Sequence, residues 1–138
     1  MKRKYLIFIC VCWILTLFTT TAFASSEKSI NYPTRFTNIN TFENTFYISS
    51  NGQASVSSYI TARNVDSVKV VAILQQYNNG NWKTIKSWSE TTKRTRGGAG
   101  GKWYVLSGNK YRIVSYGYTY VNGREVESTS YTSNYKVY

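Results

Sequence analysis

Short stretches in which apolar and polar residues alternate fill the chain from residue 43 to its end, and turn residues separate them. Alternation with a period of two is typical of β-strands that bury one face. Asparagine followed by glycine at residues 51–52, 79–80 and 122–123 indicates tight hairpins, because both residues tolerate a positive φ. The pattern predicts an all-β, antiparallel β-sandwich over residues 43–138, with strands near 44–50, 53–62, 67–77, 82–90, 102–107, 110–121 and 124–133.

The hairpin around Asn79-Gly80 can be registered from the sequence alone. A two-residue loop pairs Tyr77 with Trp82 and, further along, Val71 with Trp88. The opposite face holds Ala72, Leu74 and Ile85, which are small or aliphatic, so we assign that face to the core. Tyr77, Trp82 and Trp88 would then point outward, with Lys86 among them. Exposed aromatic rings can stack on sugars, but cross-strand aromatic pairs also stabilise hairpins by roughly 0.2–1 kcal/mol.

The hairpin around Asn122-Gly123 is harder to orient. Its two-residue loop pairs Tyr120 with Glu125 and Tyr118 with Glu127. One face carries tyrosines, and the other carries small residues such as Ser115 and Gly117. The sequence leaves open which of the two faces is buried.

The first 24 residues have the order of an export signal. Positive residues at 2–4 precede an apolar run over 5–18, and Ala22-Phe23-Ala24 supplies the small residues that precede cleavage. The apolar run is shorter than the roughly 20 residues of a membrane-spanning helix, which disfavours the alternative of an uncleaved anchor. We therefore predict cleavage after Ala24. Residues 25–42 are polar and aperiodic and form a predicted lead-in segment of the secreted product.

The residue types that remain restrict the chemistry. The only cysteines, Cys10 and Cys12, lie within the predicted signal, and the chain has no histidine. A Ser-His-Asp or Cys-His site cannot be built, and the preferred transition-metal ligands are missing. Glu125 and Glu127 are the one close carboxylate pair, which we interpret as charges that discourage edge pairing rather than as a glycosidase pair. The sequence predicts no enzyme, no catalytic residue, no metal site and no cofactor.

The charge is strongly positive. Of 17 Lys and Arg residues, three precede the predicted cleavage site, which leaves 14 against six acidic residues and a net charge of +8. Such a surface attracts polyanions through its summed field. Outside a cell these would be anionic wall polymers, acidic glycans or anionic lipids, whereas an exported protein rarely meets nucleic acid.

Residues 93–102, called the basic segment below, combine four cations with a glycine-rich run. They resemble a phosphate-binding loop only superficially, because Lys102 is followed by Trp103 instead of Ser or Thr. We interpret the segment as a solvated, mobile loop between two strands. The alternative is a loop that wraps an anionic ligand with its glycine amides and its cations Lys93, Arg94, Arg96 and Lys102.

The run Leu106-Ser107-Gly108-Asn109-Lys110-Tyr111-Arg112-Ile113 resembles the turn before strand F of immunoglobulin-like and fibronectin-type-III-like domains. That resemblance implies a tyrosine corner, in which Tyr111 and Ile113 point inward and the phenol bonds nearby backbone. The chain as a whole, including residues 74–83 and its tyrosine-rich end, resembles small secreted proteins of clostridia, which are Gram-positive, and the family called domain of unknown function 6147. This second resemblance implies no activity.

These observations together favour a secreted or envelope-associated, non-catalytic protein that binds an anionic or glycan polymer or an anionic lipid surface. After cleavage no transmembrane segment is expected. A second hypothesis is a cationic antimicrobial or toxin-like protein, against which the lack of an amphipathic helix counts. The residues expected to contact the partner are Lys93, Arg94, Arg96 and Lys102, with Tyr77, Trp82 and Trp88 as stacking residues.

Overall fold

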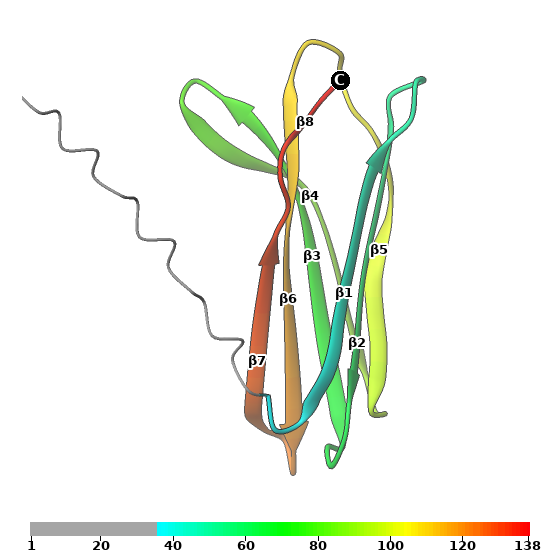
Figure 1. The fold of residues 1–138 in the computed structure, drawn as a ribbon, viewed down its shortest axis with the longest axis vertical. Helices are drawn as coiled ribbons and strands as arrows, with labels where there is room; N and C mark the ends of the chain where they lie inside the picture. Colours follow the sequence, from blue (N-terminus) through cyan, green and yellow to red (C-terminus); the bar gives the residue numbers. More distant parts are fainter. Residues whose placement is uncertain (1–35) are drawn as a thin grey trace, which may run out of the picture. The chain divides into compact units, whose positions relative to one another are not determined.

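The structure is a computed structural model that describes residues 36–138. It confirms an all-β fold in which two antiparallel sheets pack together as a β-sandwich (Figure 1). The predicted signal and the lead-in residues 25–35 lie outside the described residues. The strands are β1 (Ile39–Ile48), β2 (Gln53–Ala62), β3 (Ser67–Asn78), β4 (Asn81–Thr92), β5 (Arg96–Tyr104), β6 (Lys110–Val121), β7 (Arg124–Thr132) and β8 (Lys136–Val137).

One sheet has the order β1-β2-β5, and the other has the order β4-β3-β6-β7, with the short β8 paired to the beginning of β6. Two of the three predicted Asn-Gly turns are present as two-residue hairpin turns. Asn79 and Gly80 have φ of 49° and 83°, and Asn122 and Gly123 have φ of 50° and 74°. Two consecutive positive φ angles are what the preferred two-residue hairpin turn requires, which explains why Asn-Gly occupies both positions. At 51–52 only Gly52 has a positive φ, and the link between β1 and β2 spans residues 49–52.

The core lies between the sheets and is built mainly from alternate residues of β2, β3 and β6. β3 contributes Val68, Val70, Ala72 and Leu74, as the sequence predicted for its aliphatic face. The apolar side chains form two clusters, one around Leu74 and Ile113 and one around Ile60 and Val70, and Trp88 packs against both.

A hydrogen bond crosses the middle of the core and joins the two sheets. The hydroxyls of Ser58 on β2 and Ser115 on β6 lie 2.7 Å apart, and both residues are fully buried. Beside them, a side chain on Gly117 would collide with Phe42 and Ile60. The small face of β6 is therefore the buried one, and its tyrosines face outward, which decides the orientation that the sequence left open.

The prediction that Trp88 and Lys86 point outward is wrong. Tyr77 does pair with Trp82, but a β-bulge at Ile85 shifts the register, so that Trp88 lies opposite Ala72 and Lys86 opposite Leu74. A one-residue shift moves every following side chain to the other face. Trp88 consequently joins the core face.

A second bulge, at Val126, has the same effect in the last hairpin. Tyr120 pairs with Glu125 as predicted, but Thr119 and not Tyr118 pairs with Glu127. The predicted register placed Glu125 and Glu127 together on the tyrosine face. In the structure they lie on opposite faces of β7.

The interpretation of the basic segment as a mobile loop is also wrong, because Arg96–Tyr104 form β5, which pairs with β2 along its whole length. The predicted strand at 102–107 begins earlier and ends earlier than expected. The glycines admit close neighbours: a Cβ on Gly98 would lie 2.8 Å from Tyr59, and one on Gly101 would lie 2.6 Å from Trp88. Glycine serves close packing here. The first strand also differs from the prediction, because β1 begins at residue 39 instead of 44.

Candidate functional site

A hollow on the described surface lies at one end of the β4-β3-β6-β7 sheet. It encloses about 380 Å³ and is open to solvent. The tip of the β3–β4 hairpin, the first residues of β6 and the link between β7 and β8 meet there (Figure 1). We call this concavity the aromatic hollow. It is lined by Tyr77, Trp82, Lys110, Arg112, Ser133, Asn134 and Tyr135.

Cations and aromatic rings are interleaved in the aromatic hollow. The rings of Tyr77 and Trp82 have centroids 5.2 Å apart and an interplanar angle of 59°. The Arg112 guanidinium lies 4.2 Å from the centroid of Trp82. The Lys110 ammonium lies 4.9 Å from the centroid of Tyr135 and 5.8 Å from that of Tyr77. Such cation–π contacts hold the charged groups in place while leaving their hydrogen-bond donors available.

Backbone register and one side-chain hydrogen bond fix these residues. Arg112 pairs with Gln75 across β3 and β6, and its Nε donates to Gln75 Oε1 at 2.9 Å. Because side chains alternate along a strand, Lys110 and Arg112 point outward while Tyr111 between them points inward.

Tyr111 anchors this end of β6 from the inside. It is 1% exposed, its hydroxyl donates to the carbonyl of Leu106 at 2.8 Å, and the Leu106 amide donates to the hydroxyl at 3.1 Å. Burial raises the pKa of the phenol, and this effect exceeds the lowering by the Leu106 and Asn109 hydrogen bonds. The predicted inward position of Tyr111 and its bond to backbone are confirmed, as is the buried position of Ile113.

The side chains of the aromatic hollow offer cations and aromatic faces in one place. Guanidinium and ammonium groups bind carboxylates or phosphates through charge-assisted hydrogen bonds, and aromatic faces provide apolar surface for a ring. Within residues 36–138, no three His, Cys, Asp or Glu residues come together as a possible metal site. In the same range no helix is long and apolar enough to cross a membrane.

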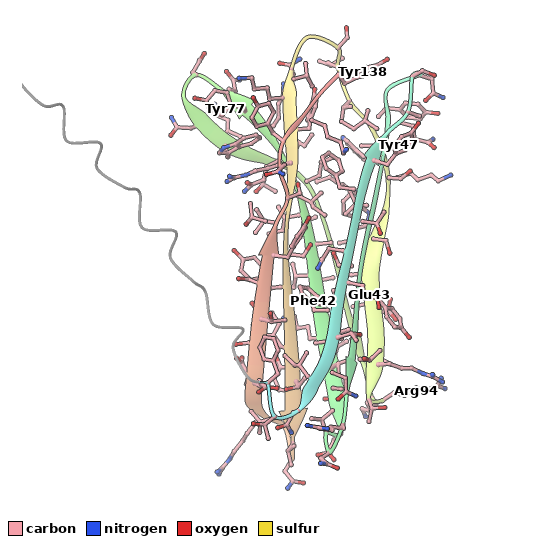
Figure 2. All side chains as sticks on the ribbon, viewed as in Figure 1. Phe42, Glu43, Tyr47, Tyr77, Arg94 and Tyr138 are labelled. Carbon is pink, nitrogen blue, oxygen red and sulfur yellow. The ribbon has the colours of Figure 1, made fainter. Side chains whose placement is uncertain are left out.

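The structure does not bring the cations of the basic segment to this hollow. Lys93 and Arg94 lie in the turn between β4 and β5. Figure 2 shows Arg94 at the opposite end of the sandwich from Tyr77. Arg96 and Lys102 lie on the outer face of the other sheet, and at about 3.3 Å per residue they are separated by about 20 Å along β5. The four cations therefore form no single cluster.

Glu127 has a structural position that the sequence did not predict. Its carboxylate accepts hydrogen bonds from the backbone amides of Thr37, Asn38 and Ile39 at 2.6–2.9 Å. Burial by itself would raise the pKa of Glu127, but the three amide donors and the nearby Arg63 outweigh it and lower that pKa. Through Glu127, strand β7 therefore holds the residues that lead into β1.

Of the predicted stacking residues, Tyr77 and Trp82 belong to the hollow and Trp88 does not. Lys110, Arg112 and Tyr135 were missed. The alternation of β6 places Lys110 and Arg112 on one face, but their proximity to the rings of the β3–β4 hairpin depends on the pairing of β6 with β3, for which the sequence has no local signal. Tyr135 follows the last predicted strand and has no pattern of its own.

No known protein family matches the chain, and no curated protein matches it significantly. The resemblance to domain of unknown function 6147 stays a prediction.

Proposed function

We propose that this chain is a secreted, non-catalytic protein that binds an anionic glycan polymer of the cell envelope through the aromatic hollow. The observation that carries the proposal is the stacking of Arg112 and Lys110 against three aromatic rings in one open concavity. An acidic sugar offers both an anionic group for the cations and a ring for the aromatic faces. Concave sites with a few convergent polar groups are typical of ligand binding.

An immunoglobulin-like classification of the sandwich is part of the same proposal. The orders β1-β2-β5 and β4-β3-β6-β7 correspond to strands A, B, E and C′, C, F, G of that architecture. Tyr111 lies at the start of the strand that corresponds to F, where the tyrosine corner occurs. Domains of this type commonly serve as binding modules, which agrees with a non-catalytic role.

Export is the remaining element of the proposal and rests on the first 24 residues. Protein recovered from the culture supernatant of an expressing host should begin at Ser25 when its N-terminus is sequenced. Recovery of the uncleaved chain in membranes alone would contradict secretion.

Binding is tested with immobilised polygalacturonate and poly(glycerol phosphate), with neutral dextran and anionic phospholipid vesicles for comparison. The variant Lys110→Gln/Arg112→Gln removes both cations of the hollow. The matched control Lys93→Gln/Arg94→Gln removes two cations from the turn at the opposite end of the sandwich. We expect the first variant to weaken polymer binding about tenfold or more, the equivalent of at least one charge-assisted contact, and the control to change it less than about twofold.

If Lys93→Gln/Arg94→Gln weakened binding and Lys110→Gln/Arg112→Gln did not, the site would lie in the basic segment and the proposal for the aromatic hollow would be refuted. Equal weakening by both variants would indicate attraction by net charge without a site. Binding to vesicles but to neither polymer would replace the glycan with a lipid surface. Equal binding of dextran and the anionic polymers would show that charge is not recognised.

A further inference from the structure

The aromatic hollow opens onto a longer surface on the same sheet. The outer-face positions of β6 run from Lys110 and Arg112 through Val114, which is itself buried, to three tyrosines, Tyr116, Tyr118 and Tyr120. The register places the half-buried Val71 and Ile73 of β3 beside Tyr116 and Val114, so β3 supplies the accessible apolar floor in the middle of this surface. At about 3.3 Å per residue, Lys110 and Tyr118 lie about 26 Å apart along the strand.

A second hollow lies at the far end of this surface. Tyr116, Tyr118 and the β7 residues Ser128, Thr129 and Ser130 line it, and it encloses about 270 Å³. We call this lining the tyrosine groove. The two tyrosine rings are 6.4 Å apart at an interplanar angle of 22°, so they present nearly parallel faces. The register pairs Tyr116 with Ser130 and Tyr118 with Ser128, so both serine side chains share the outer face with the rings.

The charge along this surface has one dominant sign. Lys69 pairs with Tyr118, and its ammonium lies 6.0 Å from the centre of that ring. Lys110 and Arg112 stand at the other end. The acidic residue on this face is Glu125, which pairs with Tyr120 beyond the tyrosine groove. A second copy that docked with the same face would bring like charges together, whereas an extended polyanion would meet cations at both ends.

We propose that the aromatic hollow and the tyrosine groove are two ends of one elongated binding surface, which takes an acidic polysaccharide chain lengthwise along β6. An acidic group lies against Lys110 and Arg112, and later sugars of the same chain lie on Tyr116 and Tyr118. Hydroxyls of those sugars meet Ser128 and Ser130. This inference rests on the proposed function and adds that the ligand is recognised over several consecutive sugars.

The test is the dependence of affinity on ligand length. Oligogalacturonates from disaccharide to decasaccharide are titrated against the protein expressed from the full chain, with glycerol phosphate oligomers of matching length, which carry charge but no sugar ring, for comparison. Affinity should rise by about tenfold or more once the oligomer spans both hollows, because the second contact becomes intramolecular. Tyr116→Ala/Tyr118→Ala should remove that rise, so that the decasaccharide binds this variant no more tightly than the disaccharide does.

The control is Tyr47→Ala/Tyr104→Ala, which removes two exposed tyrosines from the outer face of the other sheet. The control should keep the full length dependence. Short oligomers that bind through Arg112 with no gain from length would overturn the elongated surface and leave the proposed function intact. Absence of binding at every length would refute both. A tyrosine-groove variant that changed the sedimentation of the protein alone, with the length dependence intact, would assign the groove to self-association.

Discussion

The hydrogen bond between Ser58 and Ser115 gives a quantitative test of how the two sheets are held together. Its oxygens are 2.7 Å apart, and the two residues are 1% and 0% exposed, so water cannot replace a lost partner. Ser58→Ala leaves the Ser115 hydroxyl buried and unpaired, and Ser115→Ala does the same to Ser58. Each single change should lower the free energy of unfolding by about 1–3 kcal/mol, the cost of an unsatisfied buried polar group.

The double variant separates this bond from simple packing loss. It removes both hydroxyls together, so no unpaired group remains, and its cost should be no larger than that of one single change. Neighbours that share a bond typically show coupling of about 0.5–3 kcal/mol. Urea denaturation, followed by tryptophan fluorescence, gives the free energy of unfolding of the unmodified protein, the two single variants and the double variant. The coupling between Ser58 and Ser115 is calculated from these four values. If the double variant loses the sum of the two single losses, Ser58 and Ser115 do not bond and the reasoning is refuted.

Three other positions give separate predictions. Tyr111→Phe keeps the ring but removes the partner of the Leu106 amide and one of the two donors to the Leu106 carbonyl, which still accepts from Asn109 Nδ2. The cost in urea melts should be about 1 kcal/mol, the net value of a hydrogen bond, so an unchanged midpoint would contradict the tyrosine corner. Because the pKa of Glu127 is lower in the folded protein, its carboxylate stabilises the fold above the unfolded pKa of about 4.3, and this stabilisation disappears as pH falls through the folded pKa. Glu127→Gln should therefore flatten the acid dependence of the unfolding midpoint. An unaltered acid dependence would exclude the amide contacts. Gly101→Ala would place a Cβ 2.6 Å from Trp88 and should cost about 1–3 kcal/mol with a shift in tryptophan emission, whereas a neutral change would mean that Trp88 does not pack on β5.

Local patterns were sufficient for much of the fold. The Asn-Gly pairs at 79–80 and 122–123 set the hairpins because their backbone conformation depends on those two residues alone. The position of Tyr111 was implied by the resemblance of residues 106–113 to a tyrosine corner, a motif that lies within a short segment because the hydroxyl bonds the backbone of a residue five positions earlier. The aliphatic face of β3 was correctly assigned to the core because burial follows alternation directly.

Tertiary packing decided what local patterns could not. The bulge at Ile85 lets Ile85 and Trp88 both pack against the core, and no residue at that point signals an interrupted ladder. The glycines of β5 have a low intrinsic preference for strands, yet they pair with β2. Glycine is required at these positions because larger side chains would collide with Tyr59 or Trp88. The candidate site has the same origin. Alternation by itself grouped Lys110, Arg112 and Tyr116 on one face of β6, but only the packing of the two sheets decided that this face is the outer one. The pairing of β6 with β3, and of β3 with β4, then placed Arg112 over Trp82, since contacts between residues distant in sequence depend on how the whole sheet assembles.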